Sequence, residues 1–145
     1  MIGLLQRVAE ASVAVDNKII AKIEQGLLVF IGVEKEDTNP QADRLIERLL
    51  GYRVFADEAG KMNLSLTDIK GSLLLVPQFT LPADTHKGMR PSFSSAAPSE
   101  IGEQMFDYLL GYANQQYSRV ESGRFGADMQ ITLTNDGPVT FWLQT

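Results

Sequence analysis

A nearly unbroken apolar run at residues 27–33 constrains the fold of this chain more than any other feature. A strand that is exposed on one face alternates apolar and polar residues, whereas the run LLVFIGV has no polar face. Such a strand has to be covered on both faces. The run therefore predicts a sheet with this strand in its interior and further elements packed on either side.

The segments before and after this run have clear patterns of their own. Residues 2–15 and 19–23 alternate loosely around a turn at 16–18, which predicts a β-meander leading into the apolar run. A helix is predicted from the cap at Thr38 or Asn39 to Gly51. Its apolar residues recur at helical spacing and predict one buried stripe: Ala42, Leu45, Ile46, Leu49 and Leu50.

The second half of the chain predicts two short strands at 52–55 and 73–76, followed by a long polar loop at 82–98. A second helix begins at Pro98 or Ser99. Strands at 125–133 and 139–143 close the domain around a turn at 135–138. The predicted buried face of the second helix consists of Ile101, Met105, Tyr108, Leu109 and Tyr112.

This order of elements predicts an α+β fold. We expect antiparallel β-sheets in a barrel-like arrangement with two main helices packed outside them. The chain has 145 residues, of which 44% are hydrophobic, and this is enough for one core. We therefore expect a single domain spanning residues 1–145.

Composition excludes several kinds of site. The chain has no cysteine, which rules out disulfides, thiol nucleophiles and cysteine-based zinc sites. The N-terminus lacks the pattern of a signal peptide, and no apolar run reaches the ~18 residues of a membrane span. We expect a soluble, cytoplasmic protein.

The net charge of −5 argues against a general nucleic-acid binder. A local patch could still hold one end of an RNA. The candidates are Lys87 and Arg90 in the long loop, together with Arg119 and Arg124, and the alternative is that all four are scattered solvated charges.

No ordinary hydrolase motif is present. The single histidine, His86, lies in the polar loop, and no Gly-x-Ser-x-Gly segment accompanies it. Thr80 ends a predicted strand at a loop and is a candidate nucleophile, but no general base is visible near it. Both residues also have a non-catalytic interpretation. His86 can be a solvated histidine in a loop, and Thr80 can be a residue of high β-propensity that completes a strand.

Two segments about sixty residues apart each place a backbone irregularity beside a predicted strand: residues 77–81 (PQFTL) and 135–140 (NDGPVT). Gly137-Pro138 is either part of a plain turn or a unit with a cis peptide bond. In the second case its rigid backbone could form a wall that discriminates the shape of a substrate at a chiral centre. Residues 123–129 combine small residues with Phe125 and Met129, and these side chains form either apolar walls of a site or part of the core.

At these residues the chain resembles the D-aminoacyl-tRNA deacylases of the bacterial and eukaryotic type. The resemblance runs from end to end. It is carried by segments 5–8, 26–29, 32–34, 61–64, 78–81, 90–94, 123–129 and 135–141.

The resemblance implies an editing enzyme that cleaves the ester of D-aminoacyl-tRNA, and of Gly-tRNA(Ala), to free tRNA and amino acid. It implies a homodimer with active sites at the interface, where Gly137 and Pro138 form a Gly-cis-Pro unit that enters the partner's site and rejects L-amino acids. Cofactors and metals are not implied. Catalysis is attributed to the 2′-OH of the tRNA rather than to a threonine nucleophile.

The same resemblance assigns roles to individual residues. Gln78, Phe79 and Thr80 match the catalytic segment. Pro77, Phe125, Ala127 and Met129 match the substrate-binding positions. Pro77 departs from the family, which usually has serine there, and proline removes both a hydroxyl and a backbone N–H.

Two alternatives follow from these observations. One is a non-catalytic module on the same fold that binds the tRNA end or another nucleic acid, and Pro77 favours it. The other is a conventional esterase, in which replacing Thr80 or His86 would abolish turnover and the tRNA 2′-OH would be dispensable.

Overall fold

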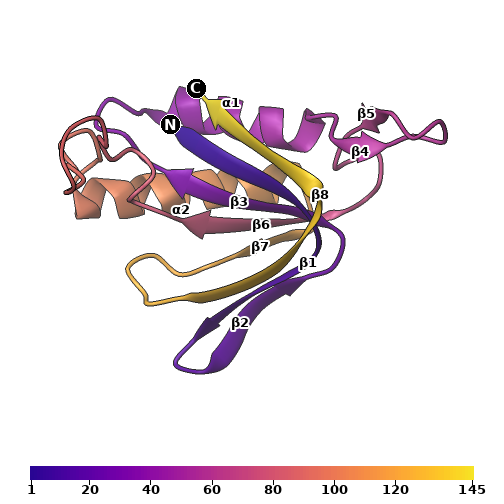
Figure 1. The fold of residues 1–145 in the computed structure, drawn as a ribbon, viewed down its shortest axis with the longest axis horizontal. Helices are drawn as coiled ribbons and strands as arrows, with labels where there is room; N and C mark the ends of the chain where they lie inside the picture. Colours follow the sequence, from indigo (N-terminus) through magenta and orange to yellow (C-terminus); the bar gives the residue numbers. More distant parts are fainter.

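The computed structural model describes residues 1–145. Figure 1 labels the elements, which follow in this order: β1 (Ile2–Val15), β2 (Lys18–Ile23), β3 (Gly26–Gly32), α1 (Asn39–Gly51), β4 (Phe55–Ala56), β5 (Met62–Leu64), β6 (Ser72–Pro77), α2 (Ser99–Gln116), β7 (Val120–Ser122) and β8 (Gln130–Gln144). No helix has both the length and the apolar character that crossing a membrane requires.

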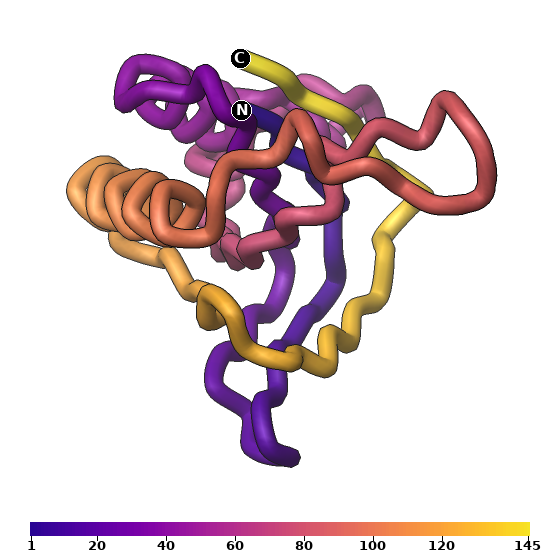
Figure 2. The backbone as a smooth tube through the Cα atoms, turned by 90° about the vertical axis from the view of Figure 1, so that its left-hand side faces the viewer, coloured from indigo at the N-terminus to yellow at the C-terminus, as the bar shows by residue number.

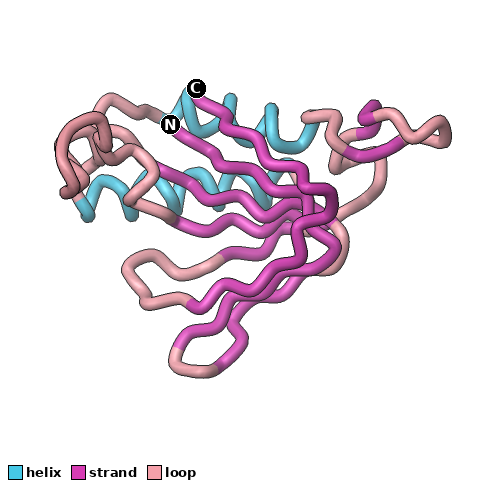
Figure 3. Tube along the Cα trace, viewed as in Figure 1, coloured by secondary structure: helices cyan, strands magenta, loops and turns pink.

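The main sheet has the order β2-β1-β3-β6-β7, and β8 pairs with β1. The pairs β1–β2, β1–β3 and β1–β8 are antiparallel, whereas β3–β6 and β6–β7 are parallel. Figure 3 shows the strands curling around toward one another while the helices lie outside. The predicted α+β fold, with two helices on a mostly antiparallel, barrel-like sheet, is confirmed, and the two parallel pairs are an addition to it.

Both faces of the central strands are buried, as the apolar run at 27–33 predicts. On one face Leu27, Val29 and Ile31 join a cluster of 19 buried residues that includes the inner faces of α1 and α2. On the other face Leu28 belongs to a second cluster of 8 buried residues. Partly buried Met129, Ile131 and Leu133 pack against the second cluster. Figure 2 shows both helices on the same side of the sheet, so the second cluster is covered by strands and by Met129 of the segment before β8 rather than by a helix.

The first helix forms where the sequence predicts it. Thr38 is the N-cap, Pro40 lies in the first turn, and the Gln41 side chain reaches back to accept a hydrogen bond from the Thr38 backbone N–H at 3.1 Å. Its buried residues are Ala42, Leu45, Ile46 and Leu49, the predicted stripe except for Leu50, which is only partly buried.

The predicted strand at 52–55 is wrong except for Phe55. Tyr52 is the C-cap of α1, and its ring packs edge-on against Phe141 with centroids 5.7 Å apart. The short pair β4–β5 follows instead, around a turn in which Asp57 accepts hydrogen bonds from the backbone N–H groups of Ala59 and Lys61.

The predicted buried face of α2 is also wrong in part. The buried residues are Gly102, Phe106, Leu109 and Ala113, whereas Ile101 and Tyr108 are exposed. Glycine and alanine at the contact allow neighbouring groups to approach the helix closely, and a face chosen by the largest apolar side chains misses them.

The closing strands differ from the prediction in two places. Residues 125–129 form a turn rather than strand, with Gly126 at φ +71°, and the short strand β7 precedes them. The two strands predicted around 135–138 are one continuous strand, β8, which carries an irregularity at that point.

A stability prediction follows from the contact between β3 and β6. A Cβ on Gly26 would lie 1.9 Å from the backbone oxygen of Ser72, so a side chain there forces these paired strands apart. We expect Gly26→Ala to lower the free energy of unfolding by about 2–4 kcal/mol in urea denaturation. Gly51→Ala is the matched control, because nothing lies within 4 Å of its added Cβ. Equal stability of the two variants would contradict this account.

Candidate functional site

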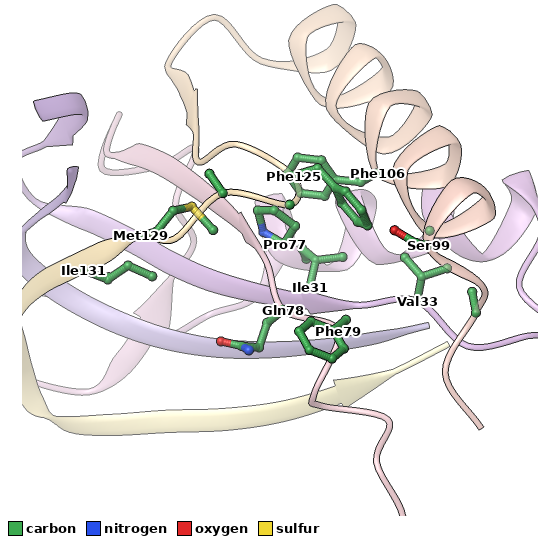
Figure 4. Close-up of a pocket in the computed structure, with 14 residues that line it drawn as sticks. Ile31, Val33, Pro77, Gln78, Phe79, Ser99, Phe106, Phe125, Met129 and Ile131 are labelled. Carbon is green, nitrogen blue, oxygen red and sulfur yellow. The ribbon is translucent and has the colours of Figure 1, made fainter. Parts of the chain in front are cut away.

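A pocket of about 450 Å³ opens where β3 and β6 end, between the start of α2 and the segment that joins β7 to β8 (Figure 4). Most of its lining is apolar. The lining residues are Ile31, Val33, Pro77, Gln78, Phe79, Ala97, Ser99, Gly102, Phe106, Phe125, Gly126, Ala127, Met129 and Ile131.

The parallel pairing of β3 and β6 forms the floor of the pocket. Ile31 lies opposite Pro77, and the backbone N–H of Gln78 donates to the Ile31 oxygen at 2.8 Å. A Cβ on Gly32 would lie 2.8 Å from Leu81 and from Pro82. The absence of a side chain there lets the chain turn directly over β3 after β6 ends, and this turn presents Phe79 at the pocket.

Close contacts between small and large residues shape the opposite wall. The ring of Phe125 lies against Gly102 of α2, where an added Cβ would lie 3.4 Å from Cζ. The Met129 sulfur folds back over Gly123 and accepts a hydrogen bond from the Arg124 backbone N–H at 3.4 Å. These contacts hold both apolar side chains at the pocket, where they also pack against the edges of the two core clusters.

Most of the residues that sequence analysis singled out meet in this pocket. Pro77, Gln78, Phe79, Phe125, Ala127 and Met129 all line it. Thr80 follows them at the exposed edge, where the Gln78 side-chain amide donates to its hydroxyl at 2.6 Å.

The contribution of α2 and of the end of β3 was not predicted from the sequence. Ser99, Gly102, Phe106, Ile31 and Val33 line the pocket but were predicted only as parts of structural elements. Gly102 was the one signal in the sequence for a close contact of α2 at the pocket. Glycine destabilises the interior of a helix, so its presence there often has a packing reason.

His86 lies outside the pocket. Its side chain is 90% exposed, and its Nδ1 lies 2.7 Å from an oxygen of Asp84. The backbone N–H of His86, and then its ring, hold the pKa of Asp84 below its ordinary value. No serine or threonine hydroxyl forms a hydrogen bond with this histidine, so the structure assembles no Ser-His-Asp triad around it.

The irregularity in β8 is a four-residue loop that contains Gly137-Pro138. Gln6 pairs with Thr140 and Val8 with Asn135, so residues 136–139 lie opposite Arg7 alone. The Gly137-Pro138 peptide bond is cis, as the resemblance implies, and both residues are exposed.

Arg7 holds one side of this loop. Its Nε donates to the Asp136 backbone oxygen at 2.8 Å and lies 3.4 Å from the Asp136 carboxylate, while Nη1 donates to the Val54 backbone oxygen at 2.6 Å. The Arg7 side chain is only 14% exposed. Because charge-assisted hydrogen bonds in a partly buried site are strong, the first residue of the loop has a fixed position.

Asn135 closes the loop from the other side. Its side-chain amide donates to the Val139 backbone oxygen at 3.1 Å, and its side-chain oxygen accepts from the Val139 N–H at 2.9 Å. Both ends of residues 136–139 are therefore pinned, and the groups between them point outward.

The loop does not reach the pocket of its own chain. Arg7 pairs on its other side with Leu27, and Ile31 at the pocket lies four residues further along β3. At a strand rise of ~3.3 Å per residue this separation is about 13 Å. Neither Gly137 nor Pro138 lines the pocket.

The model of the D-Tyr-tRNA(Tyr) deacylase family matches residues 4–144. The chain belongs to this family. It is 62% identical over 144 residues to the D-aminoacyl-tRNA deacylase of Nitrosococcus oceani, covering 99% of this chain and 93% of that protein. It is 63% identical over 144 residues to the D-aminoacyl-tRNA deacylase of Pseudomonas putida, covering 99% of each.

Two solved structures are similar over nearly the whole chain. The c-Myc DNA Unwinding Element Binding Protein is 37% identical with a TM-score of 0.96, and the match covers 100% of this chain and 99% of that one. A probable eukaryotic D-amino acid tRNA deacylase is 18% identical with a TM-score of 0.88, and the match covers 99% and 98%. The second similarity shows the fold that the family shares.

Asn135 provides a test of how the loop is held. Asn135→Ala removes both hydrogen bonds to partly buried Val139 groups and should lower the free energy of unfolding by about 1–3 kcal/mol in urea denaturation. Asn135→Asp keeps an acceptor for the Val139 N–H but no donor for its oxygen, so we expect an intermediate loss. Alanine and aspartate variants as stable as the unmodified protein would show that the loop needs no such closure.

Proposed function

We propose that this chain hydrolyses the ester bond of D-aminoacyl-tRNA, and of Gly-tRNA(Ala), and spares L-aminoacyl-tRNA. It would act in the cytoplasm as a homodimer. The observation that carries the proposal is the pocket itself. The family resemblance implies an aminoacyl-tRNA site at residues 77–80 and 123–129, and residues of both segments line one cavity that has mostly apolar walls and no general base.

The apolar walls suit the end of the substrate. Phe125 and Met129 face the cavity together with Phe106 and Ile31, and they offer flat and flexible surfaces for a nucleoside. Stacking on an aromatic ring is a general way to hold an unpaired base, at ~1–3 kcal/mol per base. In this arrangement the terminal adenosine of the tRNA lies in the pocket, and the esterified amino acid lies at its mouth beside Thr80.

The backbone after β6 supplies donors for the reaction. The N–H groups of Phe79 and Thr80 have no acceptor within the chain, whereas those of Gln78 and Leu81 on either side do. Two free N–H groups at a fixed turn can stabilise the oxyanion that forms when water adds to the ester carbonyl. The tRNA 3′-oxygen then leaves with a proton, and the products are free tRNA and the amino acid.

We propose that the tRNA 2′-OH assists the attacking water. An aminoacyl ester is already reactive, so positioning and oxyanion stabilisation can provide most of the acceleration. The Thr80 hydroxyl accepts a hydrogen bond from Gln78, and no group that could serve as its base lies within hydrogen-bonding distance. This environment favours a positioning role for Gln78 and Thr80 over nucleophilic attack.

The loop at residues 136–139 acts across the dimer in this proposal. The loop is pinned at both ends and exposed, and it is offset from the pocket of its own chain by about 13 Å along β3, which supports action at the pocket of a second copy. There Gly137 and Pro138 would stand as a rigid wall beside the Cα of the amino acid. A hydrogen atom fits against such a wall and an L side chain collides with it.

The surface around β8 supports association between copies. β8 pairs only with β1, which leaves one edge of a 15-residue strand without a partner. Phe141 and Trp142 on this strand are 37% and 51% exposed. Long open strand edges that carry apolar side chains are typical interfaces between chains.

Deacylation of matched substrates tests the function directly. We expect rapid loss of D-Tyr and Gly from their tRNAs and an L-Tyr ester that decays no faster than in buffer. Replacing the terminal 2′-OH with hydrogen should abolish the acceleration. Hydrolysis of all three esters alike would refute the proposed wall, and hydrolysis of none would favour a module that only binds the tRNA end.

Pro77 lines the pocket where the family usually has serine. Proline removes a hydroxyl and an N–H that could contact the adenosine or the oxyanion, so we expect Pro77→Ser to raise kcat/KM on D-Tyr-tRNA by less than about tenfold, or 1.4 kcal/mol. Pro77→Ala is the control that removes the ring without adding a hydroxyl. An increase well beyond tenfold for the serine variant alone would mean that the hydroxyl has a central role.

A further inference from the structure

The loop that joins β6 to α2 carries an exposed tip with excess positive charge, which we name the basic tip and define as residues 85–91. Asp84 and Ser92 close it by two backbone hydrogen bonds, from Asp84 N–H to Ser92 oxygen at 2.8 Å and from Ser92 N–H to Asp84 oxygen at 2.9 Å. All residues of the tip are exposed, and Figure 2 shows this segment reaching away from the rest of the chain.

The cations of the tip have no partner within the chain. Lys87 and Arg90 form no ion pair. The one carboxylate in residues 82–98 is Asp84, and it is already bonded to His86. The chain as a whole carries a net charge of −5, whereas residues 85–91 contain two cations and no carboxylate, so the tip is a local region of positive charge.

An apolar side chain lies between these cations. Met89 is 102% exposed, the highest value among the large hydrophobic residues of the chain. Methionine is flexible and polarizable, and it is common on surfaces that contact a partner. A tip with two free cations around an exposed methionine has the composition of a contact site rather than of an inert loop.

The base of the tip is fixed beside the pocket. The ring of Phe93 lies 5.4 Å from that of Phe79, which lines the pocket, and the Ser95 hydroxyl donates to the Pro82 backbone oxygen. Arg90 is three residues from Phe93 and Lys87 is six, so their Cα atoms lie within about 11 and 21 Å of it. These upper limits keep both cations near the mouth of the pocket, within reach of the nucleotides that precede one bound there.

Of the other two candidate cations, Arg124 is exposed directly before Phe125 of the pocket wall, so it is a further cation near the pocket, whereas Arg119 is remote. The backbone oxygen of Arg119 accepts from Leu73 N–H at the start of β6, so Arg119 lies at the opposite end of that strand from Pro77. On the α2 side of the pocket, Glu100 and Glu103 are exposed and would repel phosphate.

We propose that Lys87 and Arg90 hold the phosphates of the RNA strand immediately before the terminal nucleotide, so that the basic tip guides the 3′ end of the tRNA into the pocket. The inference rests on the proposed function, because it takes the terminal adenosine to occupy the pocket. The contact is electrostatic and independent of sequence, since it is made to phosphates rather than to base edges. It explains how an acidic protein holds a polyanion through one local region.

The test compares a double variant with a matched control on two substrates. Lys87→Gln/Arg90→Gln removes the cations of the tip. Lys61→Gln/Arg119→Gln removes the same charge from exposed positions at the other end of the molecule, near the β4–β5 hairpin and the start of β6 in Figure 1. The substrates are D-Tyr-tRNA and D-Tyr-adenosine, an ester with no phosphate.

We expect the tip variant to raise KM for D-Tyr-tRNA about tenfold and to leave hydrolysis of D-Tyr-adenosine unchanged. The slope of log(kcat/KM) against log[salt] should become shallower by about 1.4 to 1.8, which corresponds to two lost phosphate contacts. The control should match the unmodified protein in salt dependence and in KM, and Lys87→Arg/Arg90→Lys should restore both.

A tip variant that behaves like the control on D-Tyr-tRNA would overturn the inference. An equal loss on both substrates would also overturn it, because that outcome means a disturbed pocket. Binding of uncharged tRNA, measured in parallel by fluorescence anisotropy, keeps the two proposals separate. If the unmodified protein cleaves no ester, the proposed function fails, while weaker tRNA binding by the tip variant alone would still support the contact.

Discussion

The pairing of β1 with strands on both of its sides is the constraint on which the rest of the structure depends. Along its first half β1 lies between β3 and β8, and along its second half it lies between β2 and β8. β3 carries the floor of the pocket through its parallel pairing with β6, and β8 carries the loop at residues 136–139. One strand therefore sets the separation between the pocket and the loop, because both are built on strands that pair with it.

The two parts of the candidate site are rigid for different reasons. At the pocket, glycines let backbone and large side chains come unusually close, as Gly32 does under Leu81 and Gly102 does under Phe125. At the loop, hydrogen bonds from Arg7 and Asn135 fix its two ends in position. A site that discriminates by shape needs such fixed positions, since a wall that yields by an ångström no longer separates a D from an L centre.

The sequence predicted the elements whose signal is periodic and local. The apolar run at 27–33, the stripe of α1 and the long loop before α2 are all where their patterns place them. The parallel pairing of β6 was beyond such reasoning, because strand order depends on tertiary contacts. The wrong face of α2 arose because large apolar residues were weighted over Gly102 and Ala113, which are buried because they are small.

The candidate site was predictable to the extent that its residues lie in short segments. Residues 77–79 and 125–129 could be chosen from the sequence, and the family resemblance linked them to a function. That these segments meet with Ser99, Gly102 and Phe106 could not be predicted, because it depends on where α2 begins relative to the sheet. The placement of Gly137-Pro138 outside its own pocket likewise requires the register of β8 against β1.

The central claim is that a working site needs the pocket of one copy and the loop of another, and subunit mixing tests it most directly. Gly102→Leu should block the pocket by displacing Phe125, and Gly137→Val should deform the loop, because its Cβ would lie 2.4 Å from the Val139 nitrogen. Each variant alone should be inactive on D-Tyr-tRNA. After the two are unfolded together and refolded, half of the dimers should be hybrids with one intact site, and about a quarter of the unmodified activity should return. A mixture no more active than the separate variants, with hybrid dimers demonstrably present, would contradict the claim.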